Sequence, residues 1–110
     1  MSNVARMEIP NRMRSVNVRM SIDDMPIVAT MDYLINDNGI LPVAVWVKTK
    51  KSESTLDREL RSSGKAVSLL LQYGCSLKEI SETFTRDSII GSVVWYLFKN
   101  TEDILQGNQP

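Results

Sequence analysis

The segment Leu69-Leu-Leu-Gln-Tyr-Gly74-Cys-Ser76-Leu-Lys-Glu79-Ile80 joins two helices and decides the second half of the fold. Gly74 can adopt the left-handed conformation that ends a helix. Ser76 and Glu79 have the spacing of a capping box, in which two side chains satisfy the first N–H groups of a helix. The segment therefore predicts one helix that stops at Gly74 and another that begins directly after Ser76.

Upstream of this junction, apolar residues recur at helical spacing and predict a helix over about 55–73. They are Leu56, Leu60, Val67, Leu70 and Leu71. Ser54 and Asp57 provide a second capped start. Gly64 lies inside this helix, where glycine costs about 1 kcal/mol relative to alanine. Such a glycine indicates that another backbone passes close to the helix.

Downstream, the pattern predicts a shorter helix over 76–84, and the polar run 85–88 interrupts it. A final apolar helix is expected to open at residues 91–92 and to continue through Phe98. The tail after Asn100 is polar, and we expect residues 107–110 to be loose.

The first half of the chain alternates apolar and polar residues with a period of two, which predicts strands over 16–22, 27–35 and 40–48. Turn-forming residues separate them, Asp23-Asp24 in the first gap and Asn36 to Gly39 in the second. These strands form an antiparallel meander.

Pro42 near the start of the third strand indicates an edge strand or a bulge. A further short strand over 7–9 would make four. We therefore predict one α+β domain over residues 1–110. Its sheet half spans 1–50 and has three or four strands; its helical half spans 54–106 and has two or three helices packed on one face.

Composition excludes several function classes. Hydrophobic residues make up 43% of the chain, enough for a folded core, and thirteen basic residues balance thirteen acidic ones. This neutral balance argues against nucleic acid as a partner, because coating nucleic acid depends on neutralising phosphates. The chain has no histidine, so the commonest general base and metal ligand are missing. We expect no catalytic residues, no metal and no cofactor.

The single cysteine, Cys75, cannot form an internal disulfide, and we expect a small buried thiol without a catalytic role. No apolar run approaches the ~20 residues of a membrane span. Residues 1–10 lack the apolar core of a signal peptide. These features favour a cytoplasmic protein that does not enter a membrane.

Arginines suggest sites for an anion, because the guanidinium fork matches phosphate oxygens. Four of them precede residue 22, against the single acid Glu8: Arg6, Arg12, Arg14 and Arg19. These arginines either form a solvated surface or lie on one face of a sheet that binds an anion. Arg58 and Arg61 on the first helix form a second candidate. Their alternative is a solvated face shared with Glu59.

The segment 85–92 is a third candidate, because free N–H groups at a helix start can hold a phosphate. The residues expected to contact the phosphate there are Arg86, Ser88, Gly91 and Ser92. The alternative is a capped loop in which Arg86 pairs with Asp87 or a nearby glutamate.

Apolar residues also indicate self-association. The strand over 27–35 carries large apolar residues at both phases, and the helix through Phe98 is apolar almost all round. One layer of helices cannot cover both faces of the sheet. We therefore expect a homo-oligomer, since large exposed apolar patches mark interfaces.

Several segments match a known family. They are Leu60-Arg61, residues 67–80, Thr85-Arg86 and Gly91 in the helical half, and residues 9–14 and 38–43 in the sheet half. Together they resemble the TSCPD domain family, small domains found at the ends of some ribonucleotide reductases and as stand-alone bacterial and phage proteins. The Thr-Ser-Cys-Pro-Asp motif itself is absent. Ala44 and Val45 stand where the family often has an acid, and no CxxC tail is present.

In architecture and arginine content, the chain is also similar to phage anti-defence sponges, which sequester signalling nucleotides. This likeness implies a non-catalytic homo-oligomer that binds a phosphorylated nucleotide-type ligand. The family resemblance implies an alternative, a protein-interaction or regulatory module accessory to a ribonucleotide reductase.

Overall fold

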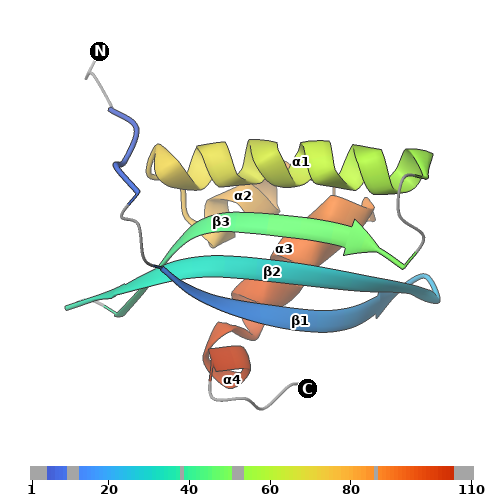
Figure 1. Ribbon diagram of the computed structural model, residues 1–110, viewed down its shortest axis with the longest axis horizontal. Coiled ribbons are helices and arrows are strands. Elements are labelled where there is room, and N and C mark those ends of the chain that lie inside the picture. The colour runs from blue at the N-terminus through green and yellow to red at the C-terminus, as the bar shows by residue number, and fades with distance from the viewer. Residues whose placement is uncertain (1–4, 10–12, 38, 51–53, 86, 106–110) are drawn as a thin grey trace.

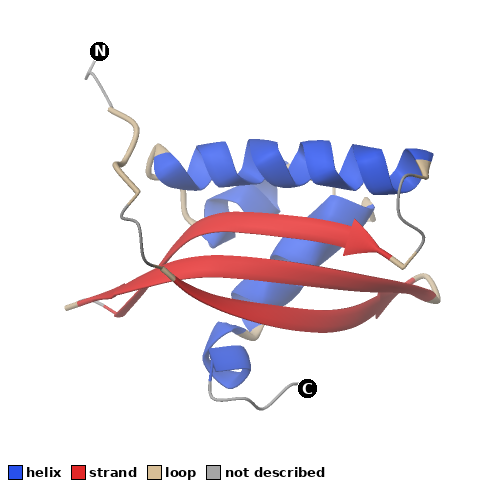
Figure 2. Ribbon diagram, viewed as in Figure 1, coloured by secondary structure: helices blue, strands red, loops and turns tan. Residues whose placement is uncertain are grey.

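The computed structural model describes residues 5–9, 13–37, 39–50, 54–85 and 87–105. Three strands come first in the chain: β1 (Arg14–Ile22), β2 (Met25–Asn36) and β3 (Gly39–Thr49). They form an antiparallel sheet in the order β1-β2-β3. Helices follow, namely α1 (Thr55–Gln72), α2 (Leu77–Thr83), α3 (Ile89–Lys99) and α4 (Thr101–Leu105). The predicted α+β fold, a meander followed by helices packed on the sheet, is confirmed (Figure 1, Figure 2).

Residues 5–9 form no strand, so the prediction of a strand over 7–9 is wrong. This segment lies against the end of α1 instead. The Met7 N–H donates to the Gln72 carbonyl at 2.8 Å, and Arg6 Nε donates to Gln72 Oε1 at 2.6 Å. Both bonds reach a helix rather than the edge of a sheet.

Both hairpins are closed by residues with positive φ, as the turn residues predict. Asp23 and Asp24 have φ values of +51° and +63°, and Ile22 pairs with Met25. This two-residue turn matches the twist of the strands on either side. Gly39 at the second hairpin has φ +114°.

A bulge interrupts β3 at the position that Pro42 indicates. Asp32 pairs with Ala44, whereas the next residue, Tyr33, pairs with Pro42. Val43 is thus an extra residue, and the bulge accommodates a proline that cannot donate a ladder hydrogen bond.

The core lies between one face of the sheet and the helices. The sheet contributes Val18, Ile27, Ala29, Met31, Val45 and Val47 to it. The helices contribute residues such as Leu71, Ile80, Val93 and Leu97. In Figure 1, α1 runs alongside β3 and α3 crosses behind the sheet, so the face toward the viewer has no helix over it.

The predicted helix caps are present at both α1 and α2. Ser54 accepts the Asp57 N–H, and Ser76 with Glu79 forms a complete capping box. Gly74 has φ +102° and ends the preceding helix. Local sequence therefore determines these boundaries.

The end of the chain differs from the prediction. Helix α3 begins at Ile89, before the predicted start at residues 91–92, because Ser88 serves as its N-cap and accepts the Gly91 N–H at 3.1 Å. The pattern predicts no helix after Asn100, but α4 forms there and buries Ile104 in the core. Residues 107–110, expected to be loose, lie outside the described residues. None of the described helices combines the length and apolarity needed to cross a membrane.

Helix α1 covers the outer edge of β3 through three buried polar side chains. Gln72 Nε2 donates to the Val43 carbonyl at 3.0 Å, and Ser68 Oγ accepts the Val45 N–H at 2.9 Å. Asp57 Oδ1 accepts the Thr49 N–H at 3.0 Å. Alternate backbone groups of the edge strand thus bond to a helix instead of another strand.

Gly64 lies where α1 and β3 approach most closely. A Cβ atom there would be 3.0 Å from the Val45 carbonyl oxygen and 3.6 Å from the Val47 nitrogen. The prediction that a backbone passes close to Gly64 is therefore confirmed.

Candidate functional site

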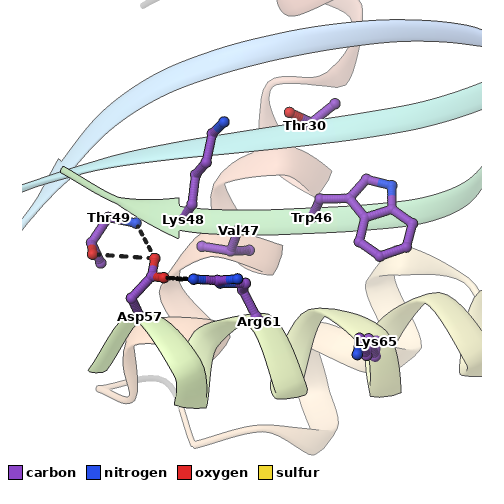
Figure 3. A pocket seen from close by; sticks show the side chains of 8 residues that line it. All are labelled: Thr30, Trp46, Val47, Lys48, Thr49, Asp57, Arg61 and Lys65. Carbon is purple, nitrogen blue, oxygen red and sulfur yellow. Dashed lines mark hydrogen bonds and ion pairs between the residues drawn. The ribbon is translucent and has the colours of Figure 1, made fainter. Parts of the chain in front are cut away.

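The best candidate site is a groove between β3 and α1, which we call the β3–α1 groove. Its volume is about 510 Å³, within the roughly 300–1,000 Å³ range of small-molecule sites. The residues that line it are Thr30, Trp46, Val47, Lys48, Thr49, Asp57, Arg61 and Lys65 (Figure 3).

Trp46 forms the aromatic wall of this groove. The period-two alternation of β3 turns its side chain to the face without helices, where 48% of it is exposed. Its Nε1–H donates to Asp32 Oδ2 at 2.9 Å, and Asp32 Oδ1 accepts a hydrogen bond from Ser15. The indole is therefore fixed at its polar edge, while part of its apolar surface is accessible.

Cationic side chains lie on both sides of the groove. Lys48 comes from β3 and Lys65 from α1, and both line the groove with Arg61 and Trp46. Figure 3 shows Lys48 extending over β2 and Arg61 extending toward Asp57. Among the described residues, neither lysine forms an ion pair. Their ammonium groups are thus available to an anion.

Arg61 is held by the one acid that lines the groove. Its Nε donates to Asp57 Oδ2 at 2.9 Å, and 52% of the arginine side chain is exposed. Asp57 is buried and also accepts the Thr49 N–H. Because Asp57 fixes one edge of the guanidinium, the cation stays at the rim of the groove.

The strand register places a further basic residue, Arg19, in the same row of the sheet as Lys48. Thr30 pairs with Asn17 on one side and with Trp46 on the other, and its Oγ1 donates to Asn17 Oδ1 at 2.6 Å. In the next row, Arg19, Val28 and Lys48 are cross-strand neighbours. This row puts Arg19 about 10 Å from Lys48, two strand spacings away.

The remaining arginines of the predicted sites lie apart from the groove. Arg14 is exposed at the start of β1, where it pairs with Tyr33. Arg58 is exposed on α1, with its Nη2 3.5 Å from Thr55 Oγ1. Neither lines the groove, and Arg12 lies outside the described residues.

At the start of α3, the N-cap residue Ser88 forms hydrogen bonds with neighbouring residues of the same chain. Ser88 Oγ donates to the Thr85 carbonyl at 2.6 Å and accepts the Gly91 N–H. The Ser92 N–H donates to the Ser88 carbonyl at 3.0 Å. A Cβ on Gly91 would lie 2.3 Å from the Thr85 oxygen, so glycine closes this loop tightly. Arg86 lies outside the described residues.

Glu79 on α2 has a carboxyl whose pKa departs clearly from its ordinary value. The backbone N–H of Ser76, and then its hydroxyl, bond to Glu79 and hold the pKa of this carboxyl below 4.5. The first of these bonds belongs to the capping box, whose other bond runs from the Glu79 N–H to Ser76 Oγ. Cys75, beside this cap, is half-buried against the core. No group of acids and cysteines within the described ranges has the geometry of a metal site.

Sequence patterns identify only part of this groove. Arg61 is among the predicted anion-binding residues, whereas Trp46 and Lys65 are not. Two signals were present in the sequence: the outward phase shared by Trp46 and Lys48, and the i, i+4 spacing of Asp57 and Arg61. Neither signal shows that α1 lies beside β3, which is what joins these residues.

No family model, curated protein or solved structure matches this chain. The resemblances drawn from the sequence therefore have no support from these comparisons, and the groove is the feature that bears on function.

Proposed function

We propose that this protein binds a phosphorylated nucleotide-type ligand in the β3–α1 groove and sequesters it without chemical change. The observation that carries the proposal is the position of Trp46 in one groove with Lys48, Arg61 and Lys65. The aromatic surface can bind the base of a nucleotide, and the cations can bind its phosphate groups.

The base would stack on the exposed surface of Trp46. Base–aromatic stacking contributes about 1–3 kcal/mol per base and tolerates different bases. The hydrogen bond from Trp46 to Asp32 orients the ring before any ligand arrives. A ring held in this way loses little side-chain freedom on binding.

The phosphate groups would lie between the lysines and Arg61. Arg61 still has N–H groups directed away from Asp57, since a guanidinium carries five donors. A chain without histidine lacks the commonest general base, which favours holding the ligand over converting it.

Fluorescence and calorimetric titration test the proposal with ADP, ADP-ribose and a cyclic dinucleotide as probes. We expect at least one to bind and to quench Trp46. Adenosine and pyrophosphate each supply half of the recognition and should bind at least tenfold more weakly. Absence of binding by all three nucleotides would refute the proposal.

Variants locate the site. Trp46→Ala should weaken binding about 5- to 150-fold through lost stacking. Lys48→Ala and Lys65→Ala should each weaken it about tenfold or more through lost charge-assisted bonds. Arg58→Ala is the matched control, because Arg58 is a cation on α1 outside the groove. Equal losses for Arg58→Ala and Lys65→Ala would contradict this site.

A further inference from the structure

The face of the sheet that no described helix covers carries a second pair of cations beside the β3–α1 groove (Figure 1). Arg19 of β1, Val28 of β2 and Lys48 of β3 are cross-strand neighbours, so their side chains leave the same face. We call these three residues the Arg19–Lys48 row. Trp46 leaves the same face two residues before Lys48, roughly 7 Å along the strand. The row therefore lies next to the indole on which the base would stack.

The two cations of the Arg19–Lys48 row are available to an anion. Both are exposed, and the side chain of Val28 between them is short and half-buried. Among the residues that the structure describes, neither Arg19 nor Lys48 forms an ion pair. The acid of β2, Asp32, lies four residues from Val28, roughly 13 Å along the strand. Its Oδ2 accepts the Trp46 Nε1–H instead.

The cations near Trp46 form two groups that lie on different sides of β3. Figure 3 shows Lys48 extending over β2, whereas Arg61 lies on the α1 side. In the strand order β1-β2-β3, the direction that Lys48 takes leads toward Arg19, two strand spacings or about 10 Å away. The first group is thus Arg61 with Lys65 at α1, and the second is Lys48 with Arg19 over β2.

We infer that the ligand carries two phosphate groups separated by a ribose, an inference that rests on the proposed function and specifies the class of nucleotide. One phosphate lies at Arg61 and Lys65. The other lies over Val28, where the guanidinium fork of Arg19 and the ammonium group of Lys48 both reach it. Two phosphates joined directly, as in a nucleoside diphosphate, occupy only one of these two positions.

Calorimetric titration with adenosine 3′,5′-bisphosphate and ADP tests the inference, because the two probes have the same base and the same number of phosphates. The 3′,5′-bisphosphate should bind at least tenfold more tightly than ADP, since it gains the contacts at the Arg19–Lys48 row. ATP controls for total charge, because its three phosphates are all at one end of the nucleoside. It should bind at least tenfold more weakly than the bisphosphate.

Variants of β1 locate the second phosphate. Arg19→Ala should weaken binding of the bisphosphate at least tenfold and change the Kd of ADP by less than twofold. Arg19→Lys keeps the charge but loses the fork, so its effect should be smaller than that of Arg19→Ala. Arg14→Ala is the matched control, because Arg14 is an exposed arginine of the same strand that pairs with Tyr33, outside the row. It should leave the affinity for both probes unchanged.

The outcomes separate this inference from the proposed function. Binding of ADP with no tighter binding of the bisphosphate would overturn the inference and leave the proposed function in place. Equal losses for Arg19→Ala and Arg14→Ala would also overturn it. A single-stranded oligoadenylate that binds more tightly than the bisphosphate would assign this face to a nucleic-acid strand and overturn the inference as well. Absence of binding by every nucleotide probe would refute both.

Discussion

The hydroxyl of Ser68 takes the place of a neighbouring strand at Val45. Ser68 Oγ accepts the Val45 N–H at 2.9 Å and lies 3.1 Å from the Val45 carbonyl oxygen and 2.8 Å from the Gly64 carbonyl oxygen. One side chain therefore satisfies buried backbone groups that would otherwise need a β-strand.

Ser68→Ala should destabilise the protein by about 1–3 kcal/mol, because it leaves the buried N–H of Val45 without its partner. Urea denaturation measures the loss. Ser62→Ala, on the exposed side of the same helix, is the control and should change stability by less than about 0.5 kcal/mol. Equal effects of the two substitutions would contradict the role of Ser68.

Gly64→Ala should bring no stabilisation, although alanine is better than glycine in a helix by about 1 kcal/mol. The added Cβ would lie 3.0 Å from the Val45 oxygen and force α1 away from β3. Gly64→Val should cost about 1–3 kcal/mol through overpacking. At exposed Ala66, Ala66→Gly should show the ordinary loss of about 1 kcal/mol. A gain of that size from Gly64→Ala would refute the close approach.

The capping box should make stability depend on pH. The Ser76 bonds lower the pKa of Glu79 in the folded state, so the carboxylate stabilises the fold above its unfolded pKa. This contribution is lost as the pH falls from about 4.5 through the lower folded pKa.

Glu79→Gln should therefore reduce the loss of thermal stability between about pH 5 and pH 3. Glu82→Gln, a change at an exposed position on the same helix, serves as the control. If both variants lose as much thermal stability as the natural sequence across this pH range, the capping box does not contribute to the pH dependence.

Cys75→Ala should reduce stability by about 1 kcal/mol, because it removes one half-buried sulfur from the edge of the core. Nucleotide binding should be unchanged, since Cys75 does not line the β3–α1 groove. Calorimetry on the variant measures both properties. Lost binding with an intact fold would give the thiol a role that its position does not explain.

Local features of the fold could be predicted from the sequence because each depends on a few neighbouring residues. The positive φ of Gly74, the Ser76–Glu79 cap and the turn at Asp23-Asp24 are of this kind. Gly64 is a partial case. A glycine inside a helix predicts that another backbone lies close to it, but the sequence does not show which segment that backbone belongs to.

The missed features depend on contacts between distant segments. Helix α4 is short, and the buried side chain of Ile104 ties it to the core. The β3–α1 groove combines Trp46 and Lys48 with residues 57–65, and the strand pattern does not show where α1 will lie. Helix α3 begins directly after Ser88 and not at residues 91–92, where the sequence pattern places its start. Serine is a strong N-cap residue, and it determines the start of the helix here more than Gly91 does.

The helix along β3 also limits how copies of this chain can aggregate. Head-to-tail addition would require the β1 strand of one molecule to join the β3 edge of the next, and repetition of that contact would build an open-ended fibre. Asp57, Ser68 and Gln72 already occupy that edge. The β3 edge is therefore not available to a strand of another molecule, and α1 blocks β-strand addition on that side of the sheet.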